Sequence, residues 1–291
     1  MAIISAKNIT KKFKTLKALD DVSLDIEKGS VYALVGINGA GKTTLLRIFA
    51  NLAYPTEGAV TMDGKPVIGC LIEAPGIFPK MSAEKNIRLK CEILGKTLQD
   101  AERIIEATGV SEYRKKAAGA LSLGQKQRLG IALALCGDPD VVILDEPMNG
   151  LDPMWVAKIR QLILDLRAEG KTIIISSHML DETAKVSDRY GILKSGKLIE
   201  TGRIGDLSED GGHVVIVAKN EITVTDEMKA FFEAHGVTYT VTGCRAELLS
   251  EEELSGRDLV ELFTRDGNDI ESFSKQQETL EEHFIRVMEG K

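Results

Sequence analysis

Hydrophobic and polar positions form two kinds of segment along residues 1–205 of the chain. Short, continuous apolar runs that end in glycine or polar residues occur at VYALVG (31–36), VVILDEP (141–147) and KTIIISSH (171–178). Segments with helical spacing lie at 42–52 and 153–170, and Pro153 suits the first turn of the second helix. Strands and helices are therefore expected to alternate from the start, as in an α/β fold with a buried, mostly parallel sheet.

Two other intervals depart from this alternation. Residues 76–138 contain successive segments of helical spacing without a strand, which predicts a helical insert between two strands of the sheet. After the glycines and acids of 204–212, short segments follow in the order strand, helix, strand, strand, helix, strand, and a last helix is expected at 278–288. This order fits a small ferredoxin-like α+β unit. We predict one domain of residues 1–205 and an accessory domain of residues 206–291.

Composition narrows the class of protein. The chain has 291 residues, 43% of them apolar and 28% charged, and its formal net charge of −7 argues against a nucleic-acid partner. The basic cluster KKFK (11–14) is interpreted as a solvated face. Four widely spaced cysteines without a CxxC pair are expected to be reduced structural thiols. The start of the chain lacks the apolar core of a secretory signal, and no apolar run approaches the ~20 residues that span a bilayer.

Residues 36–43 match the pattern G-x-x-x-x-G-K-[ST] between a predicted strand and a predicted helix. In this pattern, glycines let backbone N–H groups face phosphates, Lys42 reaches the β- and γ-phosphates, and the Thr43 hydroxyl is a Mg²⁺ ligand. The predicted contact residues are Gly36, Ile37, Asn38, Gly39, Ala40, Gly41, Lys42, Thr43 and Thr44. The sequence therefore predicts a nucleoside triphosphate and Mg²⁺ as ligands.

A pair of acids follows the predicted strand at 141–147. Asp145 is expected to hold Mg²⁺ through water. Side chains of adjacent strand residues point to opposite faces, so Asp145 and Glu146 cannot both be metal ligands of the same kind. Glu146, where the chain turns, is the candidate that orients and deprotonates the attacking water.

A second glycine-containing turn opens a helix at LSLGQKQRLG (121–130). The first backbone N–H groups of a helix point outward and the helix dipole adds partial positive charge, so this turn is also suited to an anion. One chain thus has two candidate phosphate sites.

GINGAGKTT, LSLGQKQRLGIALAL and VVILDEPMNGLDP, followed by SSH, resemble the nucleotide-binding domain of ABC-type ATPases over residues 3–205. The LS-x-GQ turn ahead of the acidic strand is specific to this family, and P-loop GTPases and kinases lack it. The resemblance implies the P-loop NTPase fold and ATP as the nucleotide. It also implies a head-to-tail homodimer, in which Ser122, Gly124 and Gln125 of one copy contact the ATP held by the phosphate loop of the other.

The resemblance implies roles for three further residues. Phe13 lies where an aromatic ring stacks on adenine; the usual residue is tyrosine, and Phe13 alone could equally be a core or edge aromatic. Asp152 would link the two active sites across the dimer. His178 would hydrogen-bond the γ-phosphate and act with Glu146 in catalysis.

Two positions depart from the family pattern. Leu123 replaces a glycine of the signature turn, and Glu73 replaces a glutamine that contacts Mg²⁺ and water. Ionised glutamate only accepts hydrogen bonds, whereas glutamine also donates. Three carboxylates around one metal, Glu73, Asp145 and Glu146, would strengthen Mg²⁺ binding or raise the pKa of one carboxyl group. If another residue fills the glutamine role, Glu73 is a bystander on the surface.

LIEAPG, EPMNGLDP and the C-terminal QQETLEEHFIRVMEG are similar to the branch of this family that serves bacitracin-resistance and lantibiotic-immunity exporters. That implies an ATPase subunit on the cytoplasmic face of a membrane, with a separate permease to which residues 73–95 pass movement. The alternatives are a soluble ABC ATPase acting on translation or DNA, and a regulatory nucleotide-binding module without turnover. The accessory domain is expected to stabilise the dimer, with regulation as the alternative.

Overall fold

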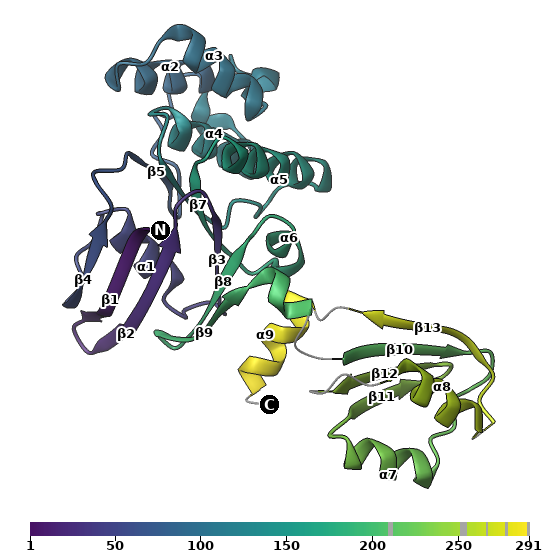
Figure 1. The fold of residues 1–291 in the computed structure, drawn as a ribbon. Coiled ribbons are helices and arrows are strands. Elements are labelled where there is room, and N and C mark those ends of the chain that lie inside the picture. The colour runs from purple at the N-terminus through teal and green to yellow at the C-terminus, as the bar shows by residue number, and fades with distance from the viewer. Residues whose placement is uncertain (209–211, 251–254, 266, 277–278, 290–291) are drawn as a thin grey trace. The chain divides into compact units, whose positions relative to one another are not determined.

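The computed structural model describes residues 1–208, 212–250, 255–265, 267–276 and 279–289 (Figure 1). The chain divides into two compact units, Met1–Gly202 and Arg203–Lys291. The predicted boundary lies after residue 205, three residues later. Residues 209–211, part of the predicted connection 204–212, lie outside the described residues.

A six-stranded sheet forms the centre of the first unit, in the order β5-β6-β7-β3-β8-β9. Its strands are β3 (Val31–Val35), β5 (Ile68–Leu71), β6 (Val141–Asp145), β7 (Thr172–Ser177), β8 (Arg189–Lys194) and β9 (Lys197–Arg203). The pairs β5–β6, β6–β7, β7–β3 and β3–β8 are parallel. Every residue of β3, β6 and β7 is buried, which explains their continuous apolar sequences and confirms the predicted parallel sheet.

The expected alternation of strands and helices from the start of the chain is wrong for the first strands. β1 (Ala2–Phe13) and β2 (Leu16–Glu27) form an antiparallel pair, and β4 (Glu57–Met62) joins them in the sheet β2-β1-β4. Buried and exposed residues alternate along much of β2, as in a sheet with one covered face. Helix α1 (Lys42–Phe49) shares one apolar core with this sheet, because Leu45, Leu46 and Phe49 pack in the same buried cluster as Ile4 and Ile9.

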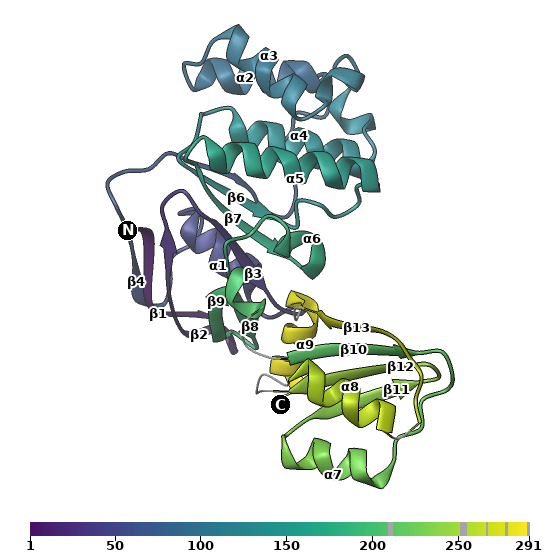
Figure 2. The same cartoon turned by 45° about the vertical axis from the view of Figure 1, so that its right-hand side comes forward.

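The interval predicted as an insert contains α2 (Ala83–Ile93), α3 (Leu98–Ala107), α4 (Leu123–Leu135) and two short 3₁₀ segments, η1 (Val110–Tyr113) and η2 (Ala118–Ala120). Ser82 caps α2, and Thr97 forms a capping box with Asp100 at the start of α3. The three helices bury an apolar cluster of their own, around Ile87, Ile105 and Leu129. Helices α5 (Pro153–Ala168) and α6 (Leu180–Ala184) follow the strands β6 and β7 (Figure 2).

The second unit has a four-stranded antiparallel sheet in the order β11-β12-β10-β13. After η3 (Ile204–Ser208), its elements are β10 (Gly212–Ala218), α7 (Asp226–Ala234), β11 (Thr238–Thr242), β12 (Arg245–Ser250), α8 (Gly256–Arg265), β13 (Ile270–Gln276) and α9 (Leu280–Glu289). Buried apolar residues of α7, α8, β10 and β12 form one core, with Phe232 and Phe263 fully buried. The element order and strand order are those expected of a ferredoxin-like unit. Among the helices of the described residues, none combines the length and the apolar composition of a membrane-spanning segment.

Candidate functional site

The phosphate loop connects β3 to α1 and closes around the amine of Lys42. Lys42 Nζ donates hydrogen bonds to the carbonyl oxygens of Gly36 (2.6 Å) and Ile37 (3.4 Å). Gly41 precedes the helix with a φ of +108°, and a side chain there would meet the carbonyl oxygen of Ala18 at 2.6 Å, so only glycine fits. Burial lowers the pKa of Lys42, while the carboxylates of Glu146 and Asp145 act in the opposite direction. The predicted lysine and acids therefore lie near one another.

Thr43 and Asp145 are in direct contact, as the predicted Mg²⁺ site requires. The Thr43 hydroxyl donates to Oδ2 of Asp145 at 2.9 Å, and the buried Ser176 hydroxyl donates to Oδ1. Asp145 is only 7% exposed. A hydroxyl and a single carboxylate, completed by phosphate oxygens and water, suit the oxygen ligands that Mg²⁺ prefers in nucleotide sites. The residues present thus fit a phosphate-bound Mg²⁺.

Glu146 turns out of the sheet one residue after β6 and meets His178 beyond the end of β7. The φ of Glu146 is +51°, a left-handed conformation that is uncommon for a side-chain-bearing residue. One carboxylate oxygen, Oε2, lies 2.7 Å from Nδ1 of His178 and 3.3 Å from the His178 backbone nitrogen. The side chain of Gln127, in α4, donates to the Glu146 carbonyl oxygen at 2.8 Å. The two candidate catalytic residues are thus adjacent, and Gln127 holds the turn that carries Glu146.

The three carboxylates expected around one metal each have a separate partner in this structure. Glu73 Oε2 forms an ion pair with Nη2 of Arg47, in α1, at 2.6 Å. Asp145 is engaged by Thr43 and Ser176, and Glu146 by His178. Within the described ranges, no group of three His, Cys, Asp or Glu side chains could hold a metal ion. Each of the three carboxylates thus has its own partner here, and a metal shared by all three stays a prediction.

The signature turn is a well-formed helix start. Ser122 Oγ accepts from the backbone N–H of Gln125, and Gln125 Oε1 accepts from the N–H of Ser122, which is a complete capping box. Gly124 lies close to the loop that follows Glu146, because a side chain there would meet the Gly150 carbonyl oxygen at 2.8 Å. Leu123 is 68% exposed. The turn therefore presents its first N–H groups beside an exposed leucine.

Asp152 and Phe13 occupy positions compatible with their predicted roles. Asp152 is the N-cap of α5, where its Oδ1 accepts from the Trp155 backbone N–H at 3.1 Å. Phe13 ends β1 and is 48% exposed, with the Lys11 amine 5.1 Å from its ring centroid. An exposed ring is available for stacking on a base, as the sequence predicts. None of these contacts by itself tests the two roles.

A buried cation–π cluster joins the signature helix to α5, and sequence reasoning missed it. The guanidinium of Arg128, in α4, lies 3.6 Å from the ring centroid of Trp155 and 4.8 Å from that of Tyr113. One Arg128 nitrogen also donates to the Gly109 carbonyl oxygen at 3.3 Å and pairs with Glu112 at 3.1 Å. The helical spacing of the apolar residues does not reveal such a cluster, because its members come from three separate elements.

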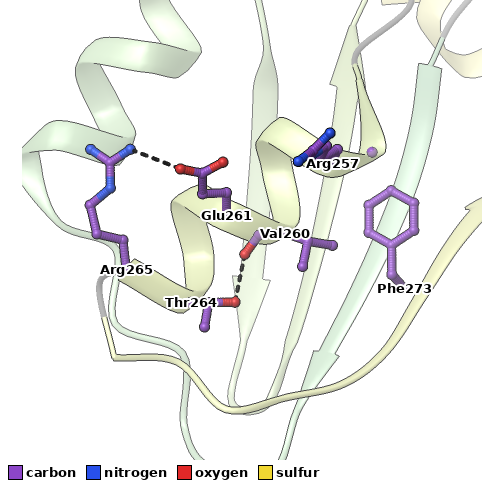
Figure 3. A pocket seen from close by; sticks show the side chains of 7 residues that line it. Arg257, Val260, Glu261, Thr264, Arg265 and Phe273 are labelled. Atoms are coloured by element: carbon purple, nitrogen blue, oxygen red, sulfur yellow. Dashed lines mark hydrogen bonds and ion pairs between the residues drawn. The ribbon is translucent and has the colours of Figure 1, made fainter.

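The second unit has a shallow hollow between α8 and β13 (Figure 3). Its lining includes Phe273 and the α8 residues Thr264 and Arg265. Thr264 donates to the Val260 carbonyl oxygen at 2.6 Å, and Arg265 pairs with Glu227 at 2.9 Å. Because these polar groups are already engaged, we assign no chemistry to the hollow. All predicted site residues lie in the first unit.

Comparison with known proteins agrees with a nucleotide site of the ABC type. A sequence profile of the family described as ABC transporter matches residues 19–149. The chain is 32% identical to the bacitracin transport ATP-binding protein BcrA of Bacillus licheniformis over 306 residues, covering 99% of this chain and 98% of BcrA. It is 36% identical to the lantibiotic transport ATP-binding protein SrtF of Streptococcus pyogenes over 204 residues, covering 68% of this chain and 89% of SrtF.

The fold is similar to that of solved ATP-binding cassettes. One is the dimeric cassette MJ0796 in a post-hydrolysis state bound to ADP and Pi, with a TM-score of 0.65 and 26% identity over 69% of this chain and 98% of that cassette. The phosphate loop, the acidic strand and the signature helix of this chain are thus found in a fold known to hold the products of ATP hydrolysis. The chain belongs to the ATP-binding proteins of ABC transporters, and its first unit is an ABC-type ATPase domain that binds ATP.

Proposed function

We propose that this chain is the ATP-hydrolysing subunit of an exporter of peptide antibiotics, working on the cytoplasmic face of the membrane with a separate permease. The observation that carries the ATPase part is the assembly of Lys42, Thr43, Asp145 and Glu146 at the carboxyl ends of β3 and β6, with His178 adjacent. The similarity to BcrA, which extends over both units, supports a peptide antibiotic as the exported substrate. The similarity to transport proteins does not favour the alternative of a soluble ATPase acting on translation or DNA.

In the proposed mechanism, the loop residues 36–44 would wrap the phosphates, and Thr43 and Asp145, which contact each other, would hold Mg²⁺, Asp145 through water. Bound Mg²⁺ would neutralise charge on the β- and γ-phosphate oxygens. The ammonium of Lys42 adds a positive charge on the same side. Glu146 accepts a proton from the attacking water, and His178 fixes the orientation of its carboxylate and contacts the γ-phosphate.

We further propose that two copies associate head to tail. Ser122, Gly124 and Gln125 of one copy then contact the phosphates held by the other, and Phe13 stacks on adenine. The exposed start of α4 suits an anion, since N–H groups and the helix dipole both favour negative charge there. Asp152 links the two sites. The dimeric cassette among the similar structures supports this arrangement.

The experiment compares the wild-type chain with Glu146→Gln. The glutamine variant is expected to lose roughly 10²–10⁴-fold in ATPase rate, because it removes the general base. It is also expected to form a stable dimer with ATP and Mg²⁺, measured by light scattering after size exclusion. Equal ATPase rates would support the regulatory module without turnover. A chain that stays monomeric with bound ATP would contradict the head-to-tail dimer.

Export needs a separate test. The chain and a candidate multi-span permease are expressed together in a bacitracin-sensitive host, and growth is measured over a range of bacitracin and lantibiotic concentrations. We expect resistance that depends on both proteins and is lost with Glu146→Gln. Unchanged sensitivity to every peptide antibiotic tested, with both proteins present in the membrane fraction, would contradict this substrate class.

A further inference from the structure

Arg47 is a residue to which the family resemblance assigns no role. It lies in the last turn of α1, the helix that begins at the phosphate loop, and its guanidinium forms the 2.6 Å ion pair with Glu73. The side chains of Arg47 and Glu73 are 42% and 57% exposed. A surface arginine on the phosphate-loop helix thus holds the acid that replaces the family glutamine.

The backbone at Glu73 repeats that at Glu146. In the parallel pair of β5 and β6, Leu71 lies opposite Leu144. Glu73 follows Leu71 by two residues, and Glu146 follows Leu144 by two residues, so the two glutamates occupy equivalent positions after their strands. Both residues are left-handed, with φ values of +60° for Glu73 and +51° for Glu146. Such a conformation persists only where surrounding contacts hold it. His178 holds the carboxylate of Glu146, and Arg47 holds that of Glu73.

The segment around Glu73 also packs against the signature helix. A side chain at Gly130, in α4, would lie 2.7 Å from Leu71 and 3.0 Å from Pro75, so the backbone of α4 approaches this segment closely. After Pro75 the chain leads to α2, the first helix of the insert (Figure 1). The segment 71–75 is therefore joined to α1 by the ion pair of Glu73 with Arg47, and it approaches α4 through Leu71 and Pro75.

We propose that Arg47 is a positioning residue whose ion pair with Glu73 transmits nucleotide binding from the phosphate loop to the insert and the signature helix of the same chain. This proposal rests on the proposed function. In it, Glu73 acts as the partner of Arg47 and not as a ligand of Mg²⁺. Because an exposed ion pair contributes modestly, its loss weakens the coupling without abolishing nucleotide binding.

Trp155, the single tryptophan of the chain, provides the readout. Its buried ring lies against Gly109 of the insert and over Arg128 of α4, so its emission depends on how these elements pack. The emission change on adding ATP and Mg²⁺ is measured in the Glu146→Gln background, where turnover is suppressed. Binding of radiolabelled ATP is measured in parallel by equilibrium dialysis.

The variants are Arg47→Ala, Glu73→Gln and the charge-swapped double variant Arg47→Glu with Glu73→Arg. Each single variant is expected to bind ATP like its parent but to show an emission change roughly two- to fivefold smaller, the factor that an exposed ion pair contributes to an equilibrium. The swapped pair is expected to restore the change. Arg103→Ala is the matched control, because it removes an exposed ion pair with Asp100 that lies away from these contacts.

Three results would overturn the inference. They are a full emission change in Arg47→Ala, no emission change in the parent protein, and a loss of Mg²⁺-dependent binding in Glu73→Gln alone, which would make Glu73 a metal ligand. Failure of the parent protein to dimerise with ATP would instead contradict the proposed function.

Discussion

The ring of Trp155 fills the space that any side chain at position 109 would need. A Cβ at Gly109 would lie 1.7 Å from Cη2 of Trp155, and Gly109 has a φ of +65°. Position 109 ends the α3 segment of the insert, whereas Trp155 lies in the first turn of α5, beside the N-cap Asp152. Gly109 therefore lets the insert pack directly on the element that carries a predicted site residue.

We expect Gly109→Ala to destabilise the first unit by about 1–3 kcal/mol, because overpacking adds to an unfavourable backbone conformation. Urea unfolding followed by circular dichroism measures the loss. Gly137→Ala is the control, since a side chain there makes ordinary contacts of 3.5 Å or more and the φ of Gly137 is not positive. The double variant Gly109→Ala with Trp155→Ala should lose less free energy of unfolding than the sum of the losses in the two single variants. A Gly109→Ala protein as stable as Gly137→Ala would contradict the packing argument.

The features that could be predicted from the sequence are those that depend on a local pattern of residues. The buried strands β3, β6 and β7 followed from continuous apolar runs, and the phosphate loop followed from its glycines, Lys42 and Thr43. The contact between Thr43 and Asp145 followed because the carboxyl ends of parallel strands meet at one edge of the sheet. These features need only the order of elements along the chain.

Other features depend on side chains that meet across the fold. Glu73 was expected beside the metal because of its place in a motif, yet Arg47, on another element, holds it. The contact of Gln127 with the Glu146 carbonyl has no signal in the motif pattern, and neither does the stacking of Arg128 on Trp155. The antiparallel pair β1–β2 was missed because the alternation of strands and helices was extended to the start of the chain. The alternation of apolar and polar residues along 22–26 (VSLDI) would have indicated a strand with one covered face.

Ser176→Ala should destabilise the first unit by about 1–3 kcal/mol, because the buried Asp145 loses a hydrogen-bond donor. The neighbouring Ser177→Ala is a matched control. Ser177 accepts a hydrogen bond from the Met179 N–H at 2.9 Å, outside the carboxylate's contacts, so we expect a smaller loss. Chemical unfolding without nucleotide provides the measurement. Equal losses in the two variants would show that the hydrogen bond from Ser176 to Asp145 adds no measurable free energy of unfolding.

His178→Ala should lower the ATPase rate by roughly 10–10²-fold, because the Glu146 carboxylate loses the group that fixes its orientation. The effect should appear mainly in kcat, since the phosphate loop still binds the nucleotide. Steady-state phosphate release over a range of ATP concentrations separates kcat from KM. His235→Ala, a change of an exposed histidine in the second unit that stacks on Phe231, serves as the control. A His178→Ala enzyme with wild-type kcat would remove His178 from the mechanism.

The insert should become less stable in acid through an ion-pair network at its surface. Arg114 pairs with Glu84 at 2.8 Å and with Glu102 at 2.6 Å, which joins α2, α3 and the segment after η1. The hydrogen bond from Arg114 lowers the pKa of Glu84, despite the opposing effect of desolvation. A carboxyl group with a lowered folded-state pKa stabilises the protein above its unfolded-state pKa, and this contribution is lost as the pH falls through the folded-state value.

Glu84→Gln should therefore cost up to about 1 kcal/mol at pH 7, and the difference from wild type should shrink as the pH falls below about 4.3, the ordinary value for glutamate. Urea unfolding of both proteins at a series of pH values from neutral to acidic gives the difference directly, because other titrating groups contribute equally to both. Glu106→Gln, a change at an exposed glutamate of α3, is the control and should leave the stability nearly unchanged at every pH. A Glu84→Gln difference that stays constant or grows in acid would show that the Arg114 ion pair does not stabilise the folded insert.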